Sequence, residues 1–286
     1  MEPLEKNPTR TNEPSHLRKR LRQTTPILAV AFLLAGLVFS NISSHSEGVD
    51  LNLQPTKRGI WAENNAPEIP IRLDLAGEGV PLGAYGVRDQ LDRELIVNTY
   101  RHSSSLLYFK RAARWFPIIE PILSEAGLPD DFKYLAIIES GLSQVVSPAG
   151  AAGFWQFMKS TAPAYGLKIN GQMDERYHVE KATRAACEYL LEAKEEFGSW
   201  ALAAASYNMG RAGLKKTLVA QGVGEYWELH LNDETARYVF RMLAIKAIFA
   251  DPEAYGFFIQ PEALYAPYAT RLISVHQSIS DFSTFA

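Results

Sequence analysis

The sequence predicts a mostly α-helical protein with one folded domain over about residues 88–260. Two observations favour this fold class: apolar residues recur at spacings of three and four, and alternating β-branched runs are almost absent. The segments with this helical spacing are 106–116, 132–138, 183–197, 200–209 and 235–249. Helix breakers such as Pro117, Gly198 and Gly210 separate these segments.

The N-terminal part of the chain is typical of a membrane-targeting segment. Residues 27–39 are 13 positions without a polar side chain, and a basic cluster at 18–22 precedes them. We therefore expect a basic cytoplasmic tail over 1–24 and a signal anchor or cleaved signal peptide over 25–42. A buried core helix of a cytosolic protein is the less favoured alternative.

The regions on either side of the helical domain read as connecting segments. Residues 43–87 are rich in small and polar residues and predict a linker or strap. Within it, apolar residues alternate with polar ones and proline over 69–75, which suggests an edge strand. Residues 261–286 are expected to form a C-terminal tail.

The composition excludes several classes of function. With 29 basic and 32 acidic residues the net charge is −3, which gives no general argument for nucleic-acid binding. The chain has a single cysteine, Cys187, which rules out an internal disulfide and a cysteine zinc site. The 6 histidines are scattered without metal-binding spacing. Carboxylates, hydroxyls and amides are therefore the expected chemical groups.

Glu139 is the candidate acid, because it is the one carboxylate within an otherwise apolar stretch of predicted helix. Pro129 and the following aspartates are typical of a helix start, and Gly141 of a helix end. Residues on both faces of this helix are apolar, so burial is expected. Burial and the negative end of the helix dipole both raise a carboxyl pKa, as a general acid requires. A surface glutamate at a frayed helix end is the alternative.

Three other motifs carry polar groups that suit a sugar. Gln156 lies among aromatic residues in SPAGAAGFWQFMKSTA, and an amide beside aromatic surface fits a sugar ring. Tyr207 and Asn208 stand at the predicted C-terminal end of an alanine-rich helix. Glu234 and Tyr238 are four residues apart and share a helix face. Core packing of the aromatics and simple helix capping remain the alternatives.

Taken in order, ESGL, SPAGAAGFWQFMKSTA, AAASYNMG and ETARYV resemble the catalytic domain of family 1 lytic transglycosylases, in particular the membrane-bound type D branch. The resemblance covers residues 116–258 and implies a single helical domain with the goose-type lysozyme-like fold. It makes Glu139 the catalytic residue, with Glu234 orienting Tyr238 or a neighbouring loop. The substrate-binding residues that it implies are Ser147, Gln156, Met158, Tyr207, Asn208, Glu234 and Tyr238.

The resemblance also implies the reaction, which is cleavage of the β-1,4 bond between N-acetylmuramic acid and N-acetylglucosamine with formation of 1,6-anhydro ends. No metal or other cofactor is implied. The expected partners are peptidoglycan glycan strands and, through an uncleaved segment 25–42, the inner membrane; nucleic acid is not expected, and the protein is expected to be a monomer. It would act on the periplasmic side of the inner membrane, or in the periplasm after cleavage.

Two alternatives to this function stay open. A hydrolytic muramidase on the same fold differs only in whether water or the sugar's C6 hydroxyl attacks. A glycan-binding scaffold without activity is less favoured, because it needs no buried acid. The sequence departs from the family in having no lipid-anchor cysteine after the apolar segment and no peptidoglycan-binding repeat after the domain, so we expect a fragment of a longer protein.

Overall fold

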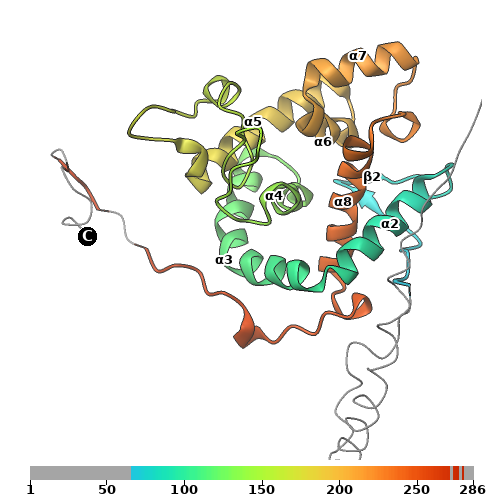
Figure 1. Ribbon diagram of the computed structural model, residues 1–286, viewed down its shortest axis with the longest axis horizontal. Helices are drawn as coiled ribbons and strands as arrows, with labels where there is room; N and C mark the ends of the chain where they lie inside the picture. The colour runs from blue at the N-terminus through green and yellow to red at the C-terminus, as the bar shows by residue number, and fades with distance from the viewer. Residues whose placement is uncertain (1–65, 271–272, 277–278, 280–286) are drawn as a thin grey trace, which may run out of the picture. The chain divides into compact units, whose positions relative to one another are not determined.

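The helix α4 (Lys133–Ser140), which is apolar on both faces, lies in the middle of the fold. In the computed structural model, which describes residues 66–270, 273–276 and 279, longer helices close a ring around it (Figure 1). They are α2 (Val87–Tyr100), α3 (His102–Ala126), α5 (Val179–Phe197), α6 (Trp200–Met209) and α8 (Asp233–Ala250). Each packs on the next, in the order α2, α3, α5, α6, α8 and back to α2. The ring removes the apolar faces of α4 from water.

The predicted mostly helical fold is confirmed, and so are its main helix boundaries. All five segments with helical spacing lie in helices or, for Phe132, in the 3₁₀ turn before α4. Gly141 and Gly198 end α4 and α5 in the left-handed conformation, with φ of 61° and 73°. The side chain of Asn232 accepts a hydrogen bond from the Thr235 N–H at 3.0 Å and so caps α8. Cys187 is buried on α5.

The prediction that Pro117 ends its helix is wrong. Pro117 and Pro121 both lie inside α3, which continues to Ala126. Each proline removes one backbone hydrogen bond, at a cost of about 3 kcal/mol or more. Both rings are exposed, while the opposite stripe of α3, including Ile119 and Leu123, is buried. Burial of that stripe outweighs the lost hydrogen bonds.

The segment before α2 packs on the helical ring. Of the predicted strand over 69–75, only β1 (Asp74–Leu75) is extended in a sheet, where it pairs antiparallel with β2 (Glu78–Gly79). Leu75 and Val80 are buried in the core, whereas Ile71 is exposed. The carboxylate of Glu78 accepts a hydrogen bond from the Trp200 N–H at 2.7 Å. This segment therefore provides a hydrogen-bond acceptor for a backbone N–H in the first turn of α6, which has no partner within the helix.

The remaining elements are short. Helix α7 (Arg211–Gln221) follows α6, and its one buried residue is Leu214. The 3₁₀ turns are Asp130–Phe132, Ala162–Tyr165, Glu175–Tyr177, Tyr226–Glu228, Glu253–Tyr255 and Pro261–Ala263. Among the described residues, no helix has the length and apolarity needed to cross a membrane. The predicted tail over 1–24 and signal anchor over 25–42 lie outside these residues.

Buried side chains hold the irregular chain over 141–178, between α4 and α5. The Arg176 guanidinium, 7% exposed, donates to the carbonyls of Gly150 and Phe157 at 2.8 and 3.0 Å. Trp155 is fully buried, and its Nε1 donates to Thr183 Oγ1 at 2.9 Å. Gly153 has φ of +79°, and a Cβ there would stand 2.0 Å from the Arg176 carbonyl oxygen. Only glycine fits at this point, so the path of the loop is tightly determined.

The loop path predicts a large difference between two glycine substitutions. In Gly150→Ala the only source of strain is the positive φ of +86°, because a Cβ at this position would have no atom within 4 Å. It should cost about 1–2 kcal/mol of unfolding free energy. Gly153→Ala adds a backbone clash and should cost at least about 2 kcal/mol more. Denaturant unfolding of both variants measures the difference, and equal stabilities would contradict the close contact with Arg176.

Candidate active site

Glu139 stands in the last turn of α4, at the point where the apolar helix emerges from the ring. The left-handed Gly141 ends the helix two residues later, beside the Tyr108 ring. Glu139 is partly exposed, while Leu135 and Ala136 on the same face are fully buried. The carboxyl group is therefore surrounded by protein yet accessible from a cavity.

The surroundings of Glu139 favour its protonated form. Burial raises the pKa of this carboxyl from 4.5 to about 7, and the negative charge of Glu234 adds to the rise. A hydrogen bond from Tyr238 and the positive charge of Arg241 act in the opposite direction and lower the pKa. Burial is the largest of these effects. Glu139 can thus hold a proton near neutral pH and release it in a reaction.

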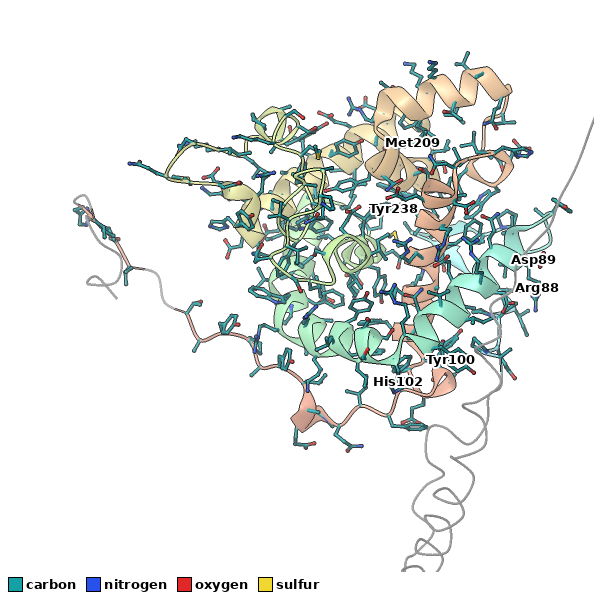
Figure 2. All side chains as sticks on the ribbon, viewed as in Figure 1. Arg88, Asp89, Tyr100, His102, Met209 and Tyr238 are labelled. Atoms are coloured by element: carbon teal, nitrogen blue, oxygen red, sulfur yellow. The ribbon has the colours of Figure 1, made fainter. Side chains whose placement is uncertain are left out.

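Two tyrosines flank Glu139. Tyr238, labelled in Figure 2, stands on α8. Its hydroxyl donates a hydrogen bond to Oε1 of Glu139 on α4. The hydroxyl of Tyr207, at the end of α6, donates to the Trp155 carbonyl at 2.8 Å. Burial, together with the charge of Glu139, raises the pKa of both phenols well above the usual value. Both hydroxyls therefore stay protonated, and Tyr238 fixes one carboxyl oxygen of Glu139.

Two cavities lie near each other in this region. The first, of about 450 Å³, lies between α2, α3, the end of α4 and α8, and it contains Glu139. The second, of about 530 Å³, lies by α6 and the loop, and Tyr207 lines it. The Gln156 side chain lines the second cavity and donates to the carbonyl of Val145, which lines the first, at 3.0 Å. The two cavities are therefore neighbours, on either side of this hydrogen bond.

Most of the predicted binding residues gather around the second cavity. Gln156, Met158, Tyr207 and Asn208 all line it. Gln156 adopts φ of 48°, and its amide also donates to the Gly153 carbonyl at 2.7 Å, so its orientation is held. Asn208 accepts from the Thr235 hydroxyl at 2.9 Å, which leaves its NH₂ group to offer to a ligand. Among these residues the Met158 side chain is exposed.

Ser147 and Glu234 do not line either cavity. The Ser147 hydroxyl accepts from the Ala151 N–H at 3.0 Å and closes the turn that carries Gly150. A direct contact between Ser147 and substrate stays a prediction. Glu234 is exposed in the first turn of α8. The Tyr238 hydroxyl bonds to Glu139, and the role of Glu234 in orienting Tyr238 or a neighbouring loop stays a prediction.

The first cavity contains charged residues that the sequence reasoning missed. Arg101, Arg111, Arg237 and Arg241 line it, together with Glu94, which is completely buried. Arg237 Nε donates to Glu94 Oε1 at 2.6 Å, so the pair joins α8 to α2. A signal was present in the sequence: Arg237 and Arg241 are four residues apart on a helix that is otherwise largely apolar.

The side chains around Glu139 are carboxyl, phenol, amide and guanidinium groups. Over the described residues, no three histidine, cysteine, aspartate or glutamate side chains are grouped so that they could hold a metal ion. The arrangement is suited to proton transfer by Glu139, with hydrogen-bond donors on either side.

Comparisons with known proteins agree with the geometry. Residues 117–229 match the family model of the transglycosylase SLT domain. Membrane-bound lytic murein transglycosylase D of Escherichia coli strain K12 is 32% identical over 248 residues, which cover 80% of this chain and 54% of that protein. The protein of the same name from Escherichia coli O6:H1 gives the same values. The chain spans about half the length of the curated relatives it matches.

The matched domain contains Glu139 and every predicted site residue except Glu234 and Tyr238, which follow it on α8. The motifs quoted above therefore lie within or directly beside the family match. The chain contains a transglycosylase SLT domain over residues 117–229 and is similar to membrane-bound lytic murein transglycosylases of type D.

Proposed function

We propose that this protein is a peptidoglycan lytic transglycosylase. In this proposal it cleaves the β-1,4 bond between N-acetylmuramic acid and N-acetylglucosamine and leaves a 1,6-anhydromuramic end. The observation that carries it is Glu139, a carboxyl with a pKa of about 7 that lines the first cavity, close to the second. A glycan strand extending through both cavities brings one glycosidic bond to this acid. The SLT domain and the lytic murein transglycosylase relatives support the same activity.

The absence of a second usable carboxylate favours a transglycosylase over a hydrolase. Glycoside hydrolases usually place two carboxylates on either side of the scissile bond. Glu94 lines the same cavity as Glu139, but its side chain is 1% exposed and bonded to Arg237. Glu234 is exposed and outside both cavities. Among the described residues, Glu139 is therefore the one accessible acid that faces the cavities.

In the proposed reaction, Glu139 acts twice. It first donates its proton to the glycosidic oxygen, and the bond from this oxygen to C1 of the muramyl sugar breaks. The carbonyl oxygen of the muramyl acetamide stabilises the positive charge that develops at C1. The Glu139 carboxylate then takes the proton of the C6 hydroxyl as O6 forms a bond to C1. The acid is regenerated and no water is consumed.

The side chains around Glu139 support each stage. The Tyr238 hydroxyl holds Oε1, so Oε2 faces the leaving oxygen, and the same hydrogen bond stabilises the carboxylate after proton transfer. Gln156 and Asn208 offer amides to the sugar in the second cavity, and Tyr207 and Met158 offer apolar surface. This cavity would hold the muramyl side of the bond. The neighbouring charged cavity would hold the other side.

We infer the finer fold and the location on the same basis. The central α4 within a helical ring and the SLT match support a goose-type lysozyme-like fold. The relatives are named membrane-bound murein transglycosylases, which supports a place in the cell envelope. Residues 25–42 would hold the domain on the periplasmic side of the inner membrane, or release it to the periplasm if cleaved.

The products of the reaction test this proposal. The protein should release muropeptides from purified sacculi as anhydro species, one water lighter than hydrolysed ones, measured by mass spectrometry. Glu139→Gln should lower the rate at least ~100-fold, because it removes the general acid. Glu188→Gln, an exposed glutamate on α5, is the matched control and should match the wild type. Hydrated products would indicate a muramidase, and equal release by Glu139→Gln would exclude Glu139 as the acid.

The pH profile tests the role of Tyr238. Wild-type kcat/KM should decline on the alkaline side with a midpoint near pH 7, where Glu139 loses its proton. Tyr238→Phe removes a hydrogen bond that lowers the Glu139 pKa, so the midpoint should rise by about one unit while the rate falls at least ~10-fold.

A second tyrosine provides the control for this profile. Tyr255 is buried outside the site, and its hydroxyl donates to the Glu68 carbonyl at 3.3 Å. Tyr255→Phe should leave the midpoint in place. An unchanged midpoint in Tyr238→Phe would contradict the proposed hydrogen bond to Glu139.

A further inference from the structure

The cavity between α2, α3 and α8 is strongly positive, although the whole chain carries a net charge of −3. Four arginines line it: Arg101, Arg111, Arg237 and Arg241. The acidic residues in its lining are Glu94 and Glu139, and Glu139 is largely uncharged below its pKa of about 7. The arginines therefore outnumber the carboxylate charge available to balance them.

The contacts of these arginines leave positive charge unbalanced. Glu94 bonds to Arg237 through Oε1, and its Oε2 lies 3.9 Å from Arg241 Nε without a hydrogen bond within the described part of the chain. Arg111 donates to the Gly141 carbonyl at 2.9 Å, which is a neutral partner. Arg101 is exposed where α2 meets α3, and no described residue forms an ion pair with it. One buried carboxylate, that of Glu94, thus lies among four guanidinium groups in the lining of this cavity.

The arginines that line this cavity, called the arginine wall below, are held in position without a ligand. Glu94 is fixed by burial and holds Arg237 against α2, while Arg111 is fixed on the end of α4. The Arg237 and Arg241 side chains are still 32% and 31% exposed, so they can reach a bound group. Guanidinium groups held in place lose little conformational freedom on binding. They match carboxylates, which they bind with paired hydrogen bonds.

We propose that this cavity binds the carboxylates of the peptide that peptidoglycan carries on its muramyl sugars. The inference rests on the proposed function, because it assigns the same strand to both cavities. Sugar hydroxyls and acetamides are neutral, so they cannot form ion pairs with the four arginines. The charged groups of peptidoglycan are in its peptides, which end in free carboxylates. The second cavity, lined by Tyr189, Tyr207 and Met158, has the apolar surface that suits the sugar rings.

The assignment has a consequence for specificity. A strand that carries its peptides gains ion pairs beside Glu139 which a strand stripped of them cannot form. The protein should therefore bind and cleave peptide-bearing strands better than bare glycan. The preference should weaken with salt, because the arginine wall is open to solvent on one side.

Arg101 and Arg88 provide a matched pair of variants for the test. Arg101 follows the C-terminal end of α2 and lines the cavity. Arg88 is an exposed arginine at the opposite end of the same helix, as the labels of Arg88 and Tyr100 show in Figure 2. Neither side chain is buried in the core, so Arg101→Gln and Arg88→Gln should both fold.

The first measurement is kcat/KM of the full chain in detergent, on uncrosslinked strands with their peptides and on the same strands after amidase treatment. The wild type should favour the peptide-bearing strands about tenfold. Arg101→Gln should lose about fivefold on these strands, through KM, and change little on stripped strands. Arg88→Gln should match the wild type on both. Equal loss by Arg101→Gln on both substrates, or no wild-type preference, would overturn the proposal.

The second measurement separates this inference from the proposed reaction. Binding of the same two strands to Glu139→Gln, followed by fluorescence anisotropy, does not depend on catalysis. Tighter binding of the peptide-bearing strand, lost when Arg101→Gln is added, would support the arginine site even if no anhydro product were formed. Equal binding of the two strands would overturn the site even if anhydro products were formed.

Discussion

The burial of the Glu139 carboxyl is the constraint on which the rest of the structure depends. Helix α4 is apolar on both faces, so it can exist only inside a ring of other helices, and it carries this acid at its exit. Moving the pKa from 4.5 to about 7 means that ionised Glu139 destabilises the fold by on the order of 3 kcal/mol. Its contribution to stability is complete below about pH 4.5 and is lost as the pH rises through about 7.

Groups close to Glu139 reduce the energetic cost of its ionisation. Tyr238 and Arg241 both lower the pKa of Glu139, so the carboxylate that forms after proton transfer is tolerated. Glu94 in turn holds Arg237 and lies near Arg241, which limits the positive field at the acid. The loop over 141–178 completes the site from the other side, where buried Arg176 and Trp155 fix its path. The result is one carboxyl that can hold a proton near neutral pH, in a positively charged cavity close to a cavity with apolar surface.

The sequence predicted the helices and the acid because these depend on local rules. Apolar spacing and the glycines Gly141 and Gly198 that end helices are read directly from the chain, and Glu139 was the one carboxylate on an apolar helix. The sequence did not predict the passage of α3 through Pro117, since burial of the opposite stripe decides that point. The arginine wall and the bond from Tyr238 to Glu139 join helices far apart in the chain. Such pairings depend on tertiary packing, which single-sequence patterns do not contain.

A direct titration of Glu139 tests the central claim most sharply. The carboxyl ¹³C resonance of Glu139 can be followed with pH in ¹³C-glutamate-labelled protein and identified by its loss in Glu139→Gln. The account predicts a midpoint near pH 7 for this carboxyl. A midpoint close to 4.5 would show that the carboxyl is solvated like a surface side chain. That result would contradict the buried acid and the mechanism built on it.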